Sequence, residues 1–327
     1  MGNNKRIIGF DIARVISILI VLYYHILGYA DVYGKHPVVR TFVYASLCIF
    51  TFLSAYLLAS KYKFETKEEI NTFYKKRVLR FYPLFFISSI LLYFLGVNGR
   101  FTTLKGLLGI SPFYKPHPIT MWYCAMLISL YLITPFWAKG GLHKQVLKFL
   151  SVIAVIILID LAFHCVVPRT YSYFTVYFAG ILISQKWGEA FLDCLKRYSI
   201  LLMSIFIILV IITFITKNDA LKYINSGWGL FALLSAYLKM GNSLRDNRTL
   251  VSVFTFLSYA SMCMYLYHRE VFVLMLRAWY PARPLFVFLY LGTIGVIISI
   301  VIAYYIQRSY DGMVSKLSQT EKQKNDK

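Results

Sequence analysis

The sequence predicts an all-α protein, a polytopic integral membrane helix bundle in which about ten helices cross the bilayer. Hydrophobic residues make up 59% of the 327 residues and charged residues only 15%, a balance unlike that of soluble domains. Apolar runs of about 20 residues recur along the chain, and this is the length that crosses the hydrocarbon core as a helix. No segment between the runs is long enough to bury its own core. We therefore expect one transmembrane domain over residues 1–310 and a polar cytoplasmic tail over residues 311–327.

Ten apolar runs define the expected helices in chain order. They lie at 12–34, 40–60, 80–97, 119–138, 146–167, 171–187, 197–216, 223–240, 250–273 and 283–307. The sixth and eighth runs are the weakest, because they are short or interrupted by polar residues. The first run lacks a small-residue cleavage site and contains Arg14 and His25, so we expect a permanent helix rather than a cleaved signal peptide.

The uneven distribution of basic residues predicts the orientation of the bundle. If the N-terminus lies in the cytoplasm, ten spans place 23 of the 35 Lys and Arg residues on the cytoplasmic side and 11 outside, with Arg14 inside a span. Such an excess is typical of cytoplasmic loops, so both termini are expected there. The net charge of +21 then indicates contact with anionic lipid headgroups, and no nucleic-acid partner is expected.

Arg14 and His25 are the most informative polar residues of the first run. They lie eleven positions apart, about three helical turns and roughly 16 Å, and therefore share one face. Such groups are expensive in hydrocarbon and mark functional sites that face the protein interior. A neutral imidazole can act as a general base, whereas a guanidinium suits the binding of phosphate or carboxylate. For either residue alone, snorkelling of Arg14 or an interhelical hydrogen bond of His25 is the simpler interpretation. Two such residues on one helix face favour a functional site.

Further charged residues flank the first and third runs. Asp11 lies three residues before Arg14, close enough for an ion pair within the helix. Arg77 and Arg80 lie three residues apart on one helix face, where two guanidinium groups can hold phosphates through bidentate bonds. The spacing of Arg77 and Arg80 alone does not distinguish such a phosphate site from an ordinary cluster of basic residues on the cytoplasmic side.

The remaining candidates lie near the external ends of later runs. His268 ends the pattern MYLYH in the ninth run, and its assignment to the site depends on whether it lies close to His25. Trp122 opens the fourth run, at a boundary where aromatic belts are typical. The histidines, carboxylates and five cysteines show neither metal-ligand spacing nor a disulfide framework, so no metal site is expected.

Taken together, these residues resemble the acyltransferase-3 family of integral membrane acyltransferases. The stretch RIIGFDIARVISILIVLYYH has the family's order of an Asp, an Arg three residues later and a His after ten more, and Arg77 and Arg80 match its basic RxxR. Weaker patterns follow in the family's order: FLSAY at Phe52–Tyr56, MWY at Met121–Tyr123, YLITP at Tyr131–Pro135 and SYASMCMYLYH at Ser258–His268. One departure is Ala55, which stands where the family commonly has Gly.

The resemblance implies a membrane O-acyltransferase, most often an O-acetyltransferase, in the inner (cytoplasmic) membrane of the cell. Such enzymes move an acyl group from cytoplasmic acyl-CoA, here expected to be acetyl-CoA, to a hydroxyl of a cell-surface polysaccharide or lipid-linked saccharide. The acyl-CoA is a co-substrate, and no permanently bound cofactor is expected. The implied site residues are His25 for catalysis, Arg14, Arg77 and Arg80 for acyl-CoA, and Asp11, Trp122, Tyr131 and His268 as supporting or acceptor-site residues.

The main alternative is a transporter or flippase for a glycan or lipid-linked saccharide. Ten spans with polar residues at membrane depth also fit that class. Inverted repeats or broken helices in matching halves would favour it, and neither is evident in the sequence. The oligomeric state is not indicated.

Overall fold

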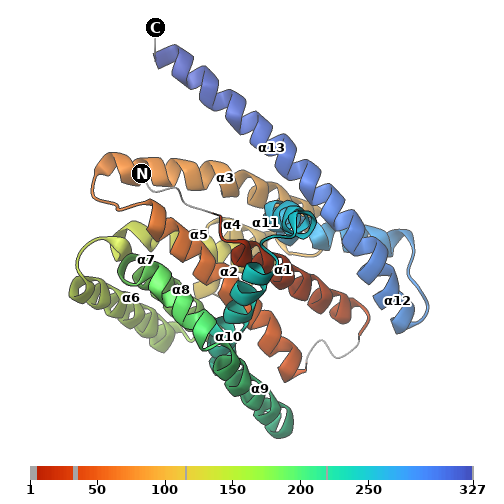
Figure 1. Cartoon of the computed structure of the whole chain (residues 1–327). Coiled ribbons are helices and arrows are strands. Elements are labelled where there is room, and N and C mark those ends of the chain that lie inside the picture. Colours follow the sequence, from red (N-terminus) through yellow and green to blue (C-terminus); the bar gives the residue numbers. More distant parts are fainter. Residues whose placement is uncertain (1–5, 32–35, 115, 219, 326–327) are drawn as a thin grey trace.

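The computed structural model describes residues 6–31, 36–114, 116–218 and 220–325, and this part of the chain is helical with no strand. Figure 1 shows the helices in chain order. The long helices are α1 (Ile8–Tyr29), α2 (Pro37–Lys61), α3 (Lys67–Phe94), α5 (Trp122–Ala138), α6 (Leu142–Phe163), α7 (Pro168–Lys186), α9 (Ser199–Thr216), α10 (Leu221–Ser243), α11 (Arg248–Ala278) and α13 (Val296–Asn325). The short ones are α4 (Arg100–Leu107), η1 (Ser111–Phe113), α8 (Gly188–Arg197), α12 (Pro284–Tyr290) and η2 (Leu291–Gly295).

Seven helices in the described residues are long and apolar enough to span a membrane, which makes this a multi-pass membrane protein. They are α1, α2, α3, α6, α9, α11 and the continuous stretch Pro284–Lys316. The other three predicted runs also fold as helices, but α5 has only 17 residues and α7 and α10 are less apolar. The all-helical fold is confirmed, and the count of about ten spans stays a prediction.

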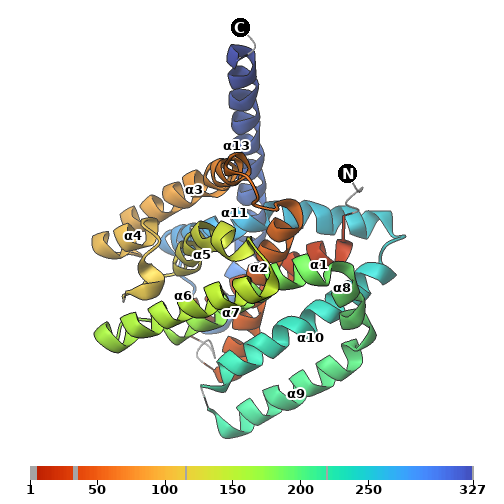
Figure 2. The ribbon, with the colours of Figure 1, turned by 90° about the vertical axis from the view of Figure 1, so that its left-hand side faces the viewer.

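The predicted boundary at residue 310 does not coincide with a break in the structure. Helix α13 continues from Val296 to Asn325, so residues 311–325 of the expected tail are helical. Figures 1 and 2 both show this helix projecting well beyond the rest of the bundle.

Helix α1 lies at the centre of the bundle and packs against α2, α10 and α11. Its contact with α10 is a direct approach of two backbones, because a Cβ added at Gly241 would lie 2.4 Å from the backbone nitrogen of Gly9. A similar approach joins α2 to α7, where a Cβ at Gly180 would lie 2.8 Å from the Cβ of Ala55. Small residues at such crossings are typical of membrane helix packing. The Ala55 methyl group is therefore accommodated by a glycine on the facing helix.

Helices α6 and α9 lie at the periphery and present apolar side chains outward. On α6, Leu158, Leu161 and Phe163 are exposed, and on α9, Ile200 and Ile215 are exposed. In water such a surface would be a large unpartnered patch. In a bilayer these side chains face lipid, as expected for helices at the edge of a membrane bundle.

Contacts along the helices define two ends of the bundle. Helices α1 and α11 run parallel, because Asp11 contacts Ser258 near their beginnings and His25 contacts His268 further along. Helix α10 runs the opposite way, with Gly241 near its end beside Gly9. We call the end at which α1 begins the arginine end, and the end at which α1 finishes the cavity end.

Candidate functional site

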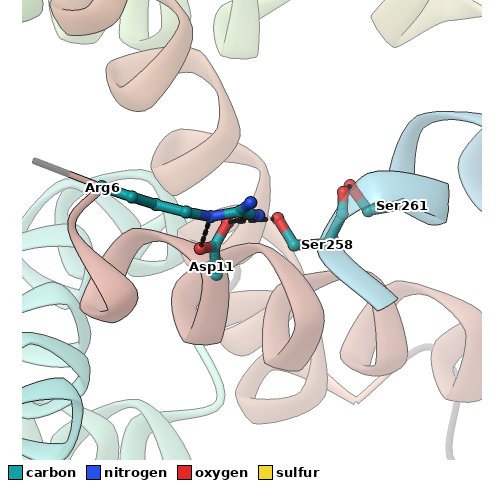
Figure 3. A network of polar contacts seen from close by, with 4 residues as sticks. All are labelled: Arg6, Asp11, Ser258 and Ser261. Atoms are coloured by element: carbon teal, nitrogen blue, oxygen red, sulfur yellow. Dashed lines mark hydrogen bonds and ion pairs between the residues drawn. The ribbon is translucent and has the colours of Figure 1, made fainter. Parts of the chain in front are cut away.

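At the arginine end, the first turn of α1 is anchored by a polar network (Figure 3). Asp11 is buried and accepts hydrogen bonds from Nε of Arg6 at 2.6 Å and from the hydroxyl of Ser258 at 2.7 Å. Ser258 lies on α11, and its carbonyl accepts a hydrogen bond from Ser261. The expected ion-pair partner of Asp11, Arg14, is thus replaced by Arg6. Asp11 serves to join α1 to α11.

Arg14 lies close to a second arginine, contributed by α3. It is partly buried and within electrostatic range of Arg80 and Arg6. Arg77, one turn before Arg80, is within electrostatic range of the buried Tyr177 on α7, and its buried Nε has no hydrogen-bond partner among the described residues. The structure therefore places the exposed Arg80 within electrostatic range of Arg14, and the partly buried Arg77 lies on the same helix as Arg80.

Tyr131 lies with the arginines and not with the other residues expected in the acceptor site. Its hydroxyl is 2.9 Å from that of Ser54, its ring packs against Phe81, and it is within electrostatic range of Arg14. Helix α5 begins at Trp122, nine residues earlier, which is about 14 Å of helix. The two aromatic residues consequently lie at different depths of the bundle.

At the cavity end, His25 and Trp122 line a cavity of about 790 Å³. The walls come from the end of α1, the start of α2, the segment before α5, the start of α7, and α11. The lining residues are Tyr24, His25, Leu27, Gly28, Tyr29, Asp31, His36, His117, Pro118, Ile119, Thr120, Trp122, Arg169 and Arg269. His25 therefore lines a cavity formed by several helices.

His25 is held by an arginine that follows His268 in the sequence. Nη2 of Arg269 donates to Nδ1 of His25 at 2.9 Å. The same guanidinium donates from Nε to the hydroxyl of Thr120 at 2.5 Å and from Nη1 to the hydroxyl of Tyr29 at 3.3 Å. Because a guanidinium only donates, Nδ1 of His25 must be the accepting nitrogen. The neutral His25 ring therefore carries its proton on Nε2.

His268 meets His25 but has the opposite tautomer. The two rings are stacked, with centroids 5.1 Å apart. Nδ1 of His268 donates to the backbone carbonyls of Met264 and Tyr265 at 3.0 and 2.9 Å, so the lone pair of this ring is on Nε2. This Nε2 atom is buried and has no partner in the part of the chain that the structure describes. The structure thus places the His268 ring beside the His25 ring.

Two side chains from the neighbouring helices complete the wall around Trp122. The guanidinium of Arg169 on α7 lies 3.7 Å from the centre of the Trp122 ring, a cation–π contact. Thr120, whose φ is +66°, receives the hydrogen bond from Arg269 on its side chain and one from Tyr265 on its carbonyl. The strained turn before α5 is therefore fixed to α11 at both of its polar groups.

Arg269, Arg169 and Thr120 were not among the residues expected from the sequence. An arginine at the edge of an apolar run looks like an ordinary interfacial anchor. The position of Arg269 directly after His268 was the one available signal.

Apolar side chains fill the stripe of α1 between Arg14 and His25. Ile18, Val21 and Leu22 occupy this stripe and are at most 1% exposed. The arginines and the cavity are thus separated by packed core along this face. No group of three metal-ligating side chains is found among the described residues.

The sequence profile described as "Acyltransferase domain", that of the acyltransferase-3 family, matches residues 7–308. This match covers nearly the whole chain and includes every site residue discussed above except Arg6. The chain belongs to the acyltransferase-3 family. No curated protein and no solved structure matches it significantly. The activity is therefore that of a membrane acyltransferase.

Proposed function

We propose that this acyltransferase moves an acetyl group from cytoplasmic acetyl-CoA to a hydroxyl of a cell-surface polysaccharide or of a lipid-linked saccharide. The observation that supports the proposal best is the position of His25. This residue of the family's Arg–His pattern lines a cavity large enough for a sugar. Its basic nitrogen is held by Arg269 at that cavity.

The arginine end suits the nucleotide portion of coenzyme A, which carries several phosphates. Arg14 and Arg80 lie within electrostatic range of each other, so an anion between them would relieve their mutual repulsion. Asp11 forms its ion pair with Arg6 and therefore leaves Arg14 able to bind a phosphate. The unpaired Nε of Arg77 adds a buried donor that a phosphate would satisfy. In the proposed orientation this end faces the cytoplasm.

The reaction proposed at the cavity end uses Nδ1 of His25 as the general base. The acceptor hydroxyl displaces Nη2 of Arg269 from Nδ1, and its proton moves to that nitrogen. The alkoxide oxygen then bonds to the thioester carbonyl carbon, and the tetrahedral intermediate collapses by breaking the carbon–sulfur bond. The coenzyme A thiolate takes the proton back from His25. The displaced guanidinium of Arg269 is well placed to stabilise the developing oxyanion.

The route of the thioester toward His25 follows from the packing of α1. Because Ile18, Val21 and Leu22 close the direct stripe from Arg14, the pantetheine arm has to part these side chains or pass along another face of α1. The first route needs a local rearrangement on donor binding, which is common in enzymes whose substrates induce closure.

A transfer assay with purified protein tests the proposal. The protein is reconstituted in vesicles with acetyl-CoA labelled in the acetyl group, and surface polysaccharide from the same cells is the acceptor. Gain of one acetyl mass per modified sugar, with release of free coenzyme A, supports the proposal. An acceptor that crosses the vesicle membrane with unchanged mass would instead identify a transporter.

A further inference from the structure

We infer that the cavity binds an anionic saccharide, one that carries a carboxylate or a phosphate close to the hydroxyl that is acylated. This inference rests on the proposed function and specifies the class of its acceptor. It is carried by the charges, hydrogen bonds and helix directions around the cavity.

Arg269 has hydrogen-bonding capacity that the protein does not use. A guanidinium has five N–H groups. Three of them are directed to Thr120, Tyr29 and His25, which leaves two, one on each terminal nitrogen. No ion pair joins Arg269 to a carboxylate within the described ranges. Since Arg269 lines the cavity, these two groups are available to a carboxylate or phosphate that binds there.

Arg169, on α7, supplies a second cation to the cavity lining. It stacks on Trp122 and has no hydrogen bond or ion pair with any other described residue. A guanidinium held against an aromatic ring loses less entropy when it binds an anion, because its freedom is already restricted. Tyr24, which also lines the cavity, is within electrostatic range of both arginines and of Arg40 on α2.

The acidic residues nearby do not balance these cations. Asp31 is the single carboxylate among the lining residues and is itself exposed. Glu270, the next residue after Arg269, is within electrostatic range of that guanidinium and of Tyr29. It is buried against α3, where it accepts a hydrogen bond from Ser88 at 2.5 Å, and its side chain does not line the cavity. Apart from its three histidines, the lining therefore carries two positive charges and one negative charge.

Helix directions add to the same preference. Helices α2, α5 and α7 begin at this cavity, where His36, Trp122 and Arg169 lie at or beside their first residues and line it. Helix N-termini carry partial positive charge and unpaired N–H groups, which favour anions. Helix α1 ends here and contributes one opposing C-terminus. Three N-termini together with two arginines leave the cavity positive overall.

The size and aromatic content of the cavity fit a sugar better than a small inorganic anion. About 790 Å³ is available, within the range of cavities that enclose small organic ligands. Tyr24 and Tyr29 line it in addition to Trp122. Aromatic faces of this kind can pack against the apolar face of a pyranose ring, while the arginines bind its charged substituent.

A binding experiment without acyl donor tests this inference independently of catalysis. Isothermal titration of the detergent-purified full chain compares a disaccharide that contains glucuronic acid with its carboxyl-reduced, neutral counterpart. A third probe, a neutral sugar linked to a short polyprenyl phosphate, distinguishes a carrier phosphate from a sugar carboxylate. The variants are Arg169→Gln, Arg169→Lys and, as a matched control outside the cavity, Arg283→Gln.

We expect at least one anionic probe to bind tenfold or more tightly than the neutral disaccharide. Arg169→Gln should remove most of that difference, Arg169→Lys should keep part of it, and Arg283→Gln should leave it unchanged. Equal affinity for all three probes would overturn the inference, as would an anion preference that survives Arg169→Gln. Because transfer is measured separately, acetylation of neutral sugars alone would contradict the inference and leave the proposed function intact.

Discussion

Nη2 of Arg269 donates a 2.9 Å hydrogen bond to Nδ1 of His25. This contact joins the middle of α11 to the last turns of α1 and determines which nitrogen of His25 carries a proton. The stacked His268 has its proton on the other type of nitrogen, because its Nδ1 donates to two backbone carbonyls. In this pair, the basic nitrogen of His25 accepts a hydrogen bond from Arg269, whereas the buried basic nitrogen of His268 has no partner among the described residues.

The tautomers of the two histidines can be measured directly. Solid-state NMR of the protein labelled with ¹⁵N-histidine in lipid should show His25 protonated at Nε2 and His268 protonated at Nδ1. Spectra of His25→Asn and His268→Asn assign the two signals. The reverse assignment for His25 would show that Arg269 does not bind Nδ1.

Replacement of Arg269 should slow the chemical step more than it weakens acetyl-CoA binding. Arg269→Gln removes the charge that orients His25 and faces the developing oxyanion, so we expect kcat to fall about a hundredfold. The KM for acetyl-CoA should change little, since the guanidinium lies at the opposite end of α1 from Arg14. Arg269→Lys should recover only part of kcat, because an ammonium cannot make the three directed hydrogen bonds. A KM effect without a kcat effect would contradict this role.

Arg77 and Arg80 should control the affinity for the donor. Each charge-assisted hydrogen bond to a phosphate contributes about 1.5–3 kcal/mol, so Arg77→Gln or Arg80→Gln should raise the KM for acetyl-CoA roughly tenfold or more. Lys76→Gln is the matched control, since Lys76 is exposed on the same helix. Donor KM should also rise with salt in the parent protein and less so in the variants. Equal effects of all three substitutions would indicate only a general loss of basic charge.

The crossing of α1 and α10 predicts a stability difference between two glycines of one helix. A Cβ at Gly241 would lie 2.4 Å from the backbone nitrogen of Gly9, whereas a Cβ at Gly227 has nothing within 4 Å. Gly241→Ala should therefore destabilise the protein by about 1–3 kcal/mol, the usual cost of overpacking. Gly227→Ala should be neutral or stabilise the helix by up to about 1 kcal/mol. Thermal unfolding in detergent, followed by fluorescence-detected gel filtration, measures both, and similar midpoints would contradict the close approach.

The sequence predicts the helices well because each helix in a membrane needs its own apolar run. The shared helix face of Arg14 and His25 was also accessible, since both residues lie in one helix with a fixed period. Arg269 and Arg169 were not, because their importance depends on how α11 and α7 pack around α1. The resemblance implies an acceptor-site role for both Tyr131 and Trp122, yet nine residues of helix place them at different depths. Contacts between helices, and not the runs themselves, determine which residues share a site.

The central claim is that His25 performs the transfer from inside the cavity, and acetyl incorporation by the variants His25→Ala and His25→Asn tests it most directly. Mass spectrometry of the acceptor should show no acetyl gain with either variant, while both bind acetyl-CoA with parental affinity and unfold at the parental temperature. Arg14→Gln, assayed in parallel, should keep a measurable kcat at a raised KM. Parental acetyl incorporation by a folded His25→Ala protein would contradict the account.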